Sequence, residues 1–233
     1  MQRTSDPLVS VVIPVRDGAA FVAAAIDSVC GQSLGDLEVI VVDDGSTDDS
    51  FAVAAGHPDG RTRAVRQAAT GAAAARNHGA RLARGEWLAF LDADDLWVAD
   101  KLRLQLAALE QTPSATMAYG HVQEFLSPEF ATAGAERAIP RLLPGYSVVT
   151  LLLRRRDFTV AGEFDERLVT GEFADWYDRG RTAGLEPLLL PDTLTLRRIH
   201  AGNLHRRRRA DSQGYPAMLK AMLDRRRASG SAA

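Results

Sequence analysis

The stretch Leu8-Val9-Ser10-Val11-Val12-Ile13-Pro14-Val15 decides the fold class, because it is a nearly continuous run of apolar, mostly β-branched residues. Such a run is typical of a strand that is buried on both faces of a parallel sheet. Two later stretches have the same character, Leu37-Glu38-Val39-Ile40-Val41-Val42 and Glu86-Trp87-Leu88-Ala89-Phe90-Leu91. Together the three stretches predict the buried centre of a sheet.

Helical patterns lie between these strands. Residues 18–30 have apolar side chains at helical spacing, and residues 72–83 are rich in alanine, which favours helix. Ser46-Thr47-Asp48-Asp49 predicts a capping box that opens another helix, and Gly85 follows the Ala-rich helix as a C′ glycine would. The remaining expected elements of this half are a weaker strand over 61–66, a helix over 100–109 and a strand over 117–122.

The regular alternation of strands and helices predicts an α/β fold with a doubly wound, mostly parallel sheet flanked by helices. The pattern weakens in the second half of the chain. There, residues 127–144 indicate mostly loop, and residues 188–190 and 194–199 indicate short strands.

The composition fits a globular protein and limits the function classes. Hydrophobic residues make up 46% of the 233 residues, which is enough for a packed core. No apolar stretch approaches the length of a membrane span, the N-terminus lacks the apolar region of a signal peptide, and Cys30 is the only cysteine. The sequence therefore predicts a cytoplasmic protein without a membrane span or a disulfide scaffold.

The near-neutral total charge hides an asymmetry along the chain. Residues 193–233 hold ten Lys and Arg against two Asp and Glu, whereas residues 1–192 hold eighteen against twenty-eight. An Arg-rich tail can attract the phosphates of nucleic acid or of an anionic membrane. Because no aromatic platform or nucleic-acid motif accompanies it, nucleic acid is not expected as a partner. Peripheral membrane contact through the tail stays open.

Acidic residues follow three of the expected strands. Asp17 comes after the first, Asp43 and Asp44 end the second, and Asp92-Ala93-Asp94-Asp95 follows the strand at 86–91. Because the carboxyl ends of parallel strands lie on one edge of the sheet, where ligands bind, these carboxylates are expected to meet. A divalent cation with oxygen ligands would offset their repulsion and keep positions for phosphate oxygens.

These residues also have purely structural interpretations. Asp44-Gly45-Ser46 can be a turn and a helix cap, and one of the later aspartates can cap the next helix. Trp87 and Trp97 are expected in the core, and His78 on a polar helix face. The sequence contains neither GxxxxGK[ST] nor GxGxxG after the first strand, so a metal-held diphosphate fits better than a glycine-rich phosphate cradle.

Four motifs, taken together, carry a resemblance to a known family. They are Val9-Ser10-Val11-Val12-Ile13-Pro14, Val41-Val42-Asp43-Asp44-Gly45-Ser46-Thr47-Asp48, Ala75-Arg76-Asn77-His78-Gly79 and Phe90-Leu91-Asp92-Ala93-Asp94-Asp95. In order and spacing they resemble family 2 glycosyltransferases, which have the GT-A fold. The resemblance is dense over 8–110 and thinner over 145–204. It implies an inverting, metal-dependent transfer of a sugar from a nucleotide-diphosphate sugar, by default a UDP-sugar.

The resemblance also implies roles for individual residues. Asp44 would contact the base, Asp92 would face the ribose, and Asp94 would hold Mn²⁺ or Mg²⁺ on the diphosphate with His200 as a further ligand. The full set implied for nucleotide-sugar binding is Pro14, Arg16, Asp17, Asp44, Gly45, Arg76, Asp92, Ala93 and Arg198.

The general base lies in a stretch that departs from the family pattern. The family usually has Gly-Glu-Asp-x-Asp-Leu, whereas this chain has Gly171-Glu172-Phe173-Ala174-Asp175, with Phe173 where Asp is usual. The candidates for the catalytic base are therefore Glu172 and Asp175, which share one face if the segment is helical. The alternative for Asp175 is an ion pair with Arg179, four residues further on.

The resemblance suggests a division of the chain into a nucleotide-sugar-binding α/β half at 1–122, a small acceptor-side half of the same domain at 123–205 and a basic tail at 206–233. The acceptor is open: a sugar, a lipid-linked molecule, a peptide or a natural product. Two other functions remain as alternatives. A nucleotidyltransferase also uses an α/β sheet with carboxylates and Mg²⁺, and a donor-binding pseudoenzyme would explain a lost base at Phe173.

Overall fold

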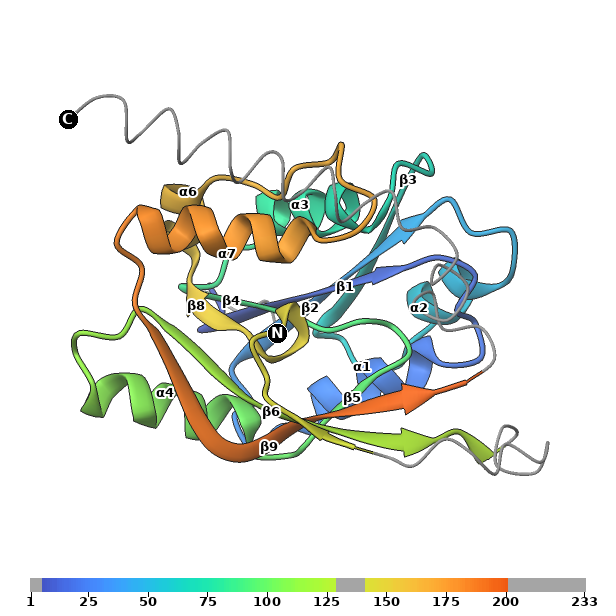
Figure 1. Cartoon of the computed structure of the whole chain (residues 1–233). Coiled ribbons are helices and arrows are strands. Elements are labelled where there is room, and N and C mark those ends of the chain that lie inside the picture. The colour runs from blue at the N-terminus through green and yellow to red at the C-terminus, as the bar shows by residue number, and fades with distance from the viewer. Residues whose placement is uncertain (1–5, 129–140, 201–233) are drawn as a thin grey trace.

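A mixed β-sheet forms the centre of the molecule. The computed structural model of the chain describes residues 6–128 and 141–200 (Figure 1). The strands lie in the order β3-β2-β1-β4-β8-β6-β9-β5, and β7 pairs with β6. Their bounds are β1 Val9–Val15, β2 Leu37–Asp44, β3 Thr62–Gln67, β4 Trp87–Phe90, β5 Leu96–Trp97, β6 Met117–Leu126, β7 Leu142–Leu143, β8 Leu152–Arg154 and β9 Pro187–Ile199.

The first four strands of the sheet order form its parallel half. β1 lies between β2 and β4 and is parallel to both, and β3 is parallel to β2. All residues of β2 are buried, as expected for a strand that is covered on both faces. The helices α1 (Val22–Cys30), α2 (Ser50–Ala55) and α3 (Ala72–Leu82) connect these strands in turn. The doubly wound α/β fold predicted from the sequence is confirmed.

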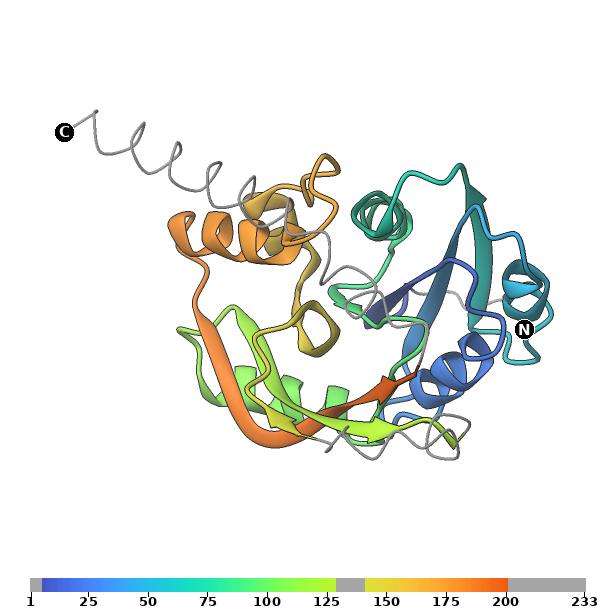
Figure 2. The same ribbon diagram turned by 45° about the vertical axis from the view of Figure 1, so that its right-hand side comes forward.

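The other half of the sheet mixes strand directions. β8 is antiparallel to β4 and β6, β9 is parallel to β6, and β5 is antiparallel to β9. Figures 1 and 2 show β6 and β9 side by side. The prediction of two short strands at 188–190 and 194–199 is wrong, because both belong to the single strand β9. Exposed Pro191 and Asp192 interrupt the apolar pattern there, while the register between β6 and β9 shifts through a bulge.

Helices cover both faces of the sheet. α1 and α4 (Lys101–Gln111) pack on one face, and α3, α6 (Arg155–Ala161) and α7 (Glu172–Thr182) pack on the other (Figure 1). The 3-10 turn η1 (Val148–Thr150) precedes β8. Trp87 and Trp97 are buried, which confirms them as core residues. Among the described helices, none has both the length and the hydropathy that a membrane span needs.

The expected capping box at 46–49 is wrong. α2 begins only at Ser50, and its N-cap residue makes no side-chain cap. Ser46 Oγ instead accepts a hydrogen bond from the N–H of Asp17 at 3.0 Å, and Asp48 Oδ2 accepts one from the N–H of Ala19 at 3.0 Å. These side chains therefore tie the loop after β1 to the loop after β2 and satisfy backbone groups that no regular element reaches.

The expected role of Gly85 as a C′ glycine is also wrong. α3 ends at Leu82, and its C-cap residue, Ala83, is extended. A Cβ atom at Gly85 would lie 2.5 Å from the backbone nitrogen of Ser10. Glycine is therefore needed here because the chain passes very close to β1 on its way into β4.

Lys101 is fully buried near the start of α4, where its charge opposes folding. Its Nζ donates to Gln105 Oε1 at 2.7 Å and lies 3.9 Å from the centroid of the Trp97 ring. Burial lowers the pKa of Lys101 well below its usual value. The Lys101 ammonium has a higher pKa in the unfolded chain than in the folded protein. The free-energy cost of burying its charge is therefore present in full at pH values below the folded-state pKa. This cost decreases as the pH rises from the folded-state pKa toward the unfolded-state pKa.

We expect the substitution Lys101→Met to raise the Tm near pH 7 by about 2–4 °C, because it removes the desolvation cost and keeps the side-chain volume. The gain should shrink as the pH rises toward the usual lysine pKa of about 10.4. Thermal denaturation of both proteins across this pH range measures the effect. An equal or lower Tm of the variant at neutral pH would show that the buried ammonium is well compensated.

Candidate functional site

The acidic residues predicted to meet do lie at one edge of the sheet. β2, β1 and β4 are neighbouring parallel strands, so their carboxyl ends point the same way. Asp17 follows β1, Asp44 ends β2, and the segment Asp92–Asp95 follows β4. Because β9 pairs with β5 just beyond this segment, the end of β9 reaches the same edge.

Asp94 and His200 are in direct contact at this edge. His200 Nε2 lies 3.0 Å from Asp94 Oδ2. The Phe21 ring packs on the imidazole, with ring centroids 4.5 Å apart. The two residues that the resemblance implied as metal ligands are thus brought together, although 106 positions separate them in the sequence.

Arg198 approaches the same loop from β9. Its Nε donates to the carbonyl of Asp94 at 3.1 Å, and its backbone N–H donates to Asp95 Oδ1 at 3.0 Å. The guanidinium lies 5.3 Å from the ring centroid of Phe21 and 4.8 Å from that of Phe125. This places a cation beside the Asp94–His200 pair, at a position that suits phosphate binding.

Asp95 is the buried member of the acidic loop. Burial, reinforced by the charges of Asp94 and Asp92, raises its pKa well above the usual value. Burial and the neighbouring carboxylates thus both disfavour the charged form of Asp95.

The donor set suits a hard divalent cation that is shared with a ligand. In the described ranges, no group of three or more His, Cys, Asp or Glu side chains comes together as a complete metal site. Asp94 and His200, which are in contact, would supply one carboxylate oxygen and one imidazole nitrogen. Carboxylate and phosphate oxygens are ligands that Mn²⁺ and Mg²⁺ prefer, so the Asp94 carboxylate fits a cation that also binds a diphosphate.

Arg76 joins the acidic loop to α7. Its guanidinium donates to Asp92 Oδ1 at 2.6 Å and to Glu172 Oε1 at 2.9 Å. Arg76 is buried, and its Nε has no hydrogen-bond partner among residues 6–128 and 141–200. Burial alone would lower the pKa of Arg76, but the charges of Asp92 and Glu172 outweigh it and the net shift is upward. One buried cation thus holds the two carboxylates in a fixed relation.

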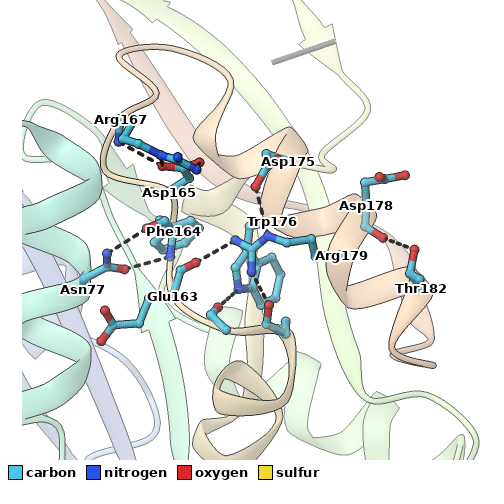
Figure 3. Close-up of polar contacts among 12 residues, drawn as sticks. Asn77, Glu163, Phe164, Asp165, Arg167, Asp175, Trp176, Asp178, Arg179 and Thr182 are labelled. Atoms are coloured by element: carbon cyan, nitrogen blue, oxygen red, sulfur yellow. Dashed lines mark hydrogen bonds and ion pairs between the residues drawn. The ribbon is translucent and has the colours of Figure 1, made fainter. Parts of the chain in front are cut away.

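Hydrogen bonds to the turn at 161–165 fix the position of α7 (Figure 3). Arg179 donates to the carbonyls of Ala161 and Glu163 and, through Nε, to Asp175 Oδ2 at 3.0 Å. Trp176 Nε1 donates to the carbonyl of Gly162 at 2.8 Å. Asp175 therefore makes the ion pair that the sequence offered as its alternative role, and it is 1% exposed.

The same turn is tied to α3. Asn77 Nδ2 donates to the carbonyl of Phe164 at 2.9 Å, and Asn77 Oδ1 accepts the N–H of Phe164 at 2.9 Å (Figure 3). Asn77 is the residue after Arg76, so α3 carries both the anchor of the turn and the partner of Glu172.

Several residues implied for nucleotide binding hold neighbouring loops of this edge together. Asp44 Oδ1 accepts the N–H of Thr70 and Asp44 Oδ2 accepts the N–H of Gly71, both at 2.9 Å, so Asp44 orders the loop before α3. Asp17 Oδ1 accepts the N–H of Thr47 at 2.7 Å, which lowers the pKa of Asp17. Gly45 has a φ of 70°, a conformation that favours glycine. The others lie at or beside the same edge: Pro14 in β1, exposed Arg16 after it, and buried Ala93 between Asp92 and Asp94.

Sequence reasoning missed several residues of the site. Phe21 is the N-cap residue of α1 and packs on His200. Gln67 Nε2 donates to Asp44 Oδ1 at 2.9 Å, and Gln67 Oε1 accepts a hydrogen bond from His78 Nδ1 at 2.9 Å. Neither residue stands in a motif, so only the folded arrangement reveals them. The run Arg206–Arg209 lies outside the described residues.

A sequence profile of the family described as "Glycosyl transferase family 2" matches residues 10–156, which is more than half of the chain. A curated relative, the "PGL/p-HBAD biosynthesis glycosyltransferase" of Mycobacterium bovis, is 34% identical over 176 residues, covering 73% of this chain and 67% of the relative. Two further curated glycosyltransferases, one of Rickettsia felis and WfgD of Escherichia coli, match over 18% and 47% of their own length. The chain thus spans less than half of those two relatives.

Solved structures share the fold. TarS of Staphylococcus aureus in complex with UDP-GlcNAc matches with a TM-score of 0.68 and 18% identity, covering 84% of this chain and 59% of that one. The mannosyltransferase PcManGT of Pyrobaculum calidifontis, in complex with GDP-Man and Mn²⁺, matches with a TM-score of 0.68 and 22% identity, covering 95% and 65%. The fold is therefore the GT-A fold. With the strand-end motifs and the profile match, the chain belongs to glycosyltransferase family 2.

Proposed function

We propose that this chain transfers a sugar from a nucleotide-diphosphate sugar, by default a UDP-sugar, to an acceptor nucleophile with inversion at the anomeric carbon and with Mn²⁺ or Mg²⁺. The observation that carries the proposal is the contact of Arg76 with both Asp92 and Glu172. This contact brings the Glu172 carboxylate beside the loop that carries Asp94, and Asp94 in turn contacts His200. A leaving-group site and a base on separate elements are what an inverting transfer needs.

The names of the structural neighbours support a nucleotide-sugar donor. TarS was solved with UDP-GlcNAc, and PcManGT with GDP-Man and Mn²⁺. In this chain Asp94 and His200 would hold the cation, Asp92 would face the ribose and Asp44 the base. When bound, the cation would neutralise charge on the departing diphosphate. Arg198 would add a second positive group beside it. A cytoplasmic location, with membrane contact through the basic tail, completes the proposal.

Glu172 is the group we assign as the general base. Its carboxylate would accept the proton of the acceptor hydroxyl while that oxygen forms a bond to the anomeric carbon. The bond from the anomeric carbon to the diphosphate breaks at the same time, and its electron pair leaves with the nucleoside diphosphate. Arg76 orients Glu172 by donating to its Oε1 at 2.9 Å, and a base must be positioned before it can accept a proton.

A thermal-shift and calorimetry panel of UDP-, GDP- and dTDP-sugars, with and without Mn²⁺, tests the donor and the cation together. We expect one nucleotide class to raise the Tm, and the rise to depend on Mn²⁺. The absence of binding by any nucleotide sugar would contradict the proposal. Release of pyrophosphate from a nucleoside triphosphate would favour a nucleotidyltransferase, and donor binding without any turnover would favour a pseudoenzyme.

The role of Arg76 leads to a separate prediction. We expect Arg76→Gln to lower the rate of donor hydrolysis by about a hundredfold, because Glu172 loses the cation that orients it. Stability should fall by about 1–3 kcal/mol, since two partly buried carboxylates lose a charged donor. Arg76→Lys keeps the charge but not the forked geometry, so it should recover stability better than activity. Equal recovery of both by lysine would show that only the charge matters.

A further inference from the structure

Four aromatic side chains gather between α7 and β6, and we call them the aromatic wall. They are Tyr119 on β6, Tyr146 before η1, and Phe173 and Tyr177 on α7. The Tyr119 ring is fully buried and lies 5.2 Å from Tyr146, 6.3 Å from Phe173 and 6.1 Å from Tyr177, between centroids. Tyr146 and Tyr177 are 5.7 Å apart, and Tyr146 is 47% exposed.

The backbone holds the wall in place. A Cβ atom at Gly145 would lie 1.5 Å from the carbonyl oxygen of Gly120, so the segment that carries Tyr146 is pressed directly against β6. Thr150 Oγ1 donates to the carbonyl of Gly145 and fixes this segment from the other side. Because the rings come from three rigidly packed elements, the wall exists before any ligand arrives.

The wall continues the proposed catalytic site. Phe173 is the residue after Glu172, and its ring also stacks on Trp176 at 6.1 Å with an interplanar angle of 21°. Phe173 therefore gives this chain an aromatic ring directly after the proposed base. The wall therefore begins one residue from the proposed base, in the first turn of α7.

We propose that the aromatic wall is the acceptor subsite and that it takes an uncharged pyranose ring, stacked through its C–H face on the exposed rings. This inference rests on the proposed function. Sugar rings combine apolar C–H faces with hydroxyl groups, and the wall offers the matching set. Its rings supply apolar faces, and the Tyr146 and Tyr177 hydroxyls have no hydrogen-bond partner among the residues that the structure describes.

The chemistry of the wall disfavours other occupants. A purely aliphatic chain laid over Tyr146 and Tyr177 would bury two phenol hydroxyls without partners, which costs free energy. An anionic acceptor would need a free cation, but the nearby guanidinium of Arg181 is already paired with Glu186 at 2.6 Å. An uncharged ring with hydroxyl groups can supply hydrogen-bond partners to the two phenols, and it needs no free cation.

Saturation-transfer NMR on the full chain tests the proposal with small probes. The probes are methyl β-D-glucopyranoside, N-acetylglucosamine, cyclohexanol as an apolar ring and methyl β-D-glucuronide as an anionic ring. We expect a pyranoside to bind in the millimolar range and to bind better than cyclohexanol or the glucuronide. Phe173→Ala and Tyr146→Ala should each weaken the pyranoside about tenfold, and Phe173→Asp should weaken it at least as much.

Val160→Ala is the matched control, because Val160 is an exposed apolar residue on α6 that makes no ring contact with the wall. Its pyranoside affinity should equal that of the wild type, and the Tm of each variant checks its folding. The proposal is overturned if no pyranoside binds, if cyclohexanol or the glucuronide binds better, or if the wall variants bind like the control. Nucleotide binding to the same wild-type sample separates the acceptor-subsite proposal from the proposed function. If UDP binds and no pyranoside does, only the acceptor-subsite proposal is contradicted. If a pyranoside binds and no nucleotide does, only the proposed donor site is contradicted.

Discussion

Replacing Asp94 with asparagine should lower cation-dependent turnover of the donor by about a thousandfold, while the fold is retained. The substitution keeps the size of the side chain but removes the negative charge that would hold the cation. It also weakens the contact with His200 Nε2, which lies 3.0 Å from Asp94 Oδ2. The Asp94 side chain is 31% exposed, and an asparagine oxygen can still accept a hydrogen bond from His200, so the fold should be retained. Release of nucleoside diphosphate, followed against Mn²⁺ concentration, measures the effect.

Asp100→Asn provides the matched control for this experiment. Asp100 is also a partly exposed aspartate, but it pairs with Arg103 and Ser33 at the start of α4. We expect its activity to equal that of the wild type. Retained Mn²⁺-dependent turnover in Asp94→Asn would remove Asp94 from the site.

The second large effect separates two carboxylates on one helix. Glu172→Gln should lower transfer and donor hydrolysis by about a hundred- to ten-thousandfold, because the base is lost. Its effect on stability should be smaller than that of Asp175→Asn, because Arg76 keeps its second carboxylate partner, Asp92. Asp175→Asn should instead lower stability strongly and activity only slightly. Asp175 is buried with Arg179, and breaking a buried pair by removing one partner costs about 3–5 kcal/mol.

Kinetics and thermal denaturation of both variants test this separation. If Asp175→Asn instead loses activity at unchanged stability while Glu172→Gln stays active, Asp175 is the base and Glu172 only anchors Arg76.

The acidic edge of the sheet could be predicted from the sequence, because the ends of the parallel strands determine where these carboxylates lie. The apolar runs before Asp17, Asp44 and Asp92 mark parallel strands, and the carboxyl ends of such strands share one edge. The expected edge is therefore present, with β1 between β2 and β4. Residue order along the chain was enough for this result.

Contacts between distant segments could not be predicted in this way. Arg76 and Glu172 are 96 residues apart, and no local pattern relates α3 to α7. The position of α7 depends on the turn that Arg179 and Asn77 hold, which is a tertiary arrangement. The capping box at 46–49 failed for a similar reason, because Ser46 bonds to a loop from another part of the chain.

The most direct test of the central claim is an anomalous-scattering map at the manganese edge, from crystals of the chain grown with Mn²⁺ and a nucleoside diphosphate. The account expects one strong peak within coordination distance of Asp94 and His200, with the diphosphate on its open side and Glu172 still bound to Arg76. A nucleotide bound at the strand edge with no manganese peak beside Asp94, or a peak held by other residues, would contradict the account.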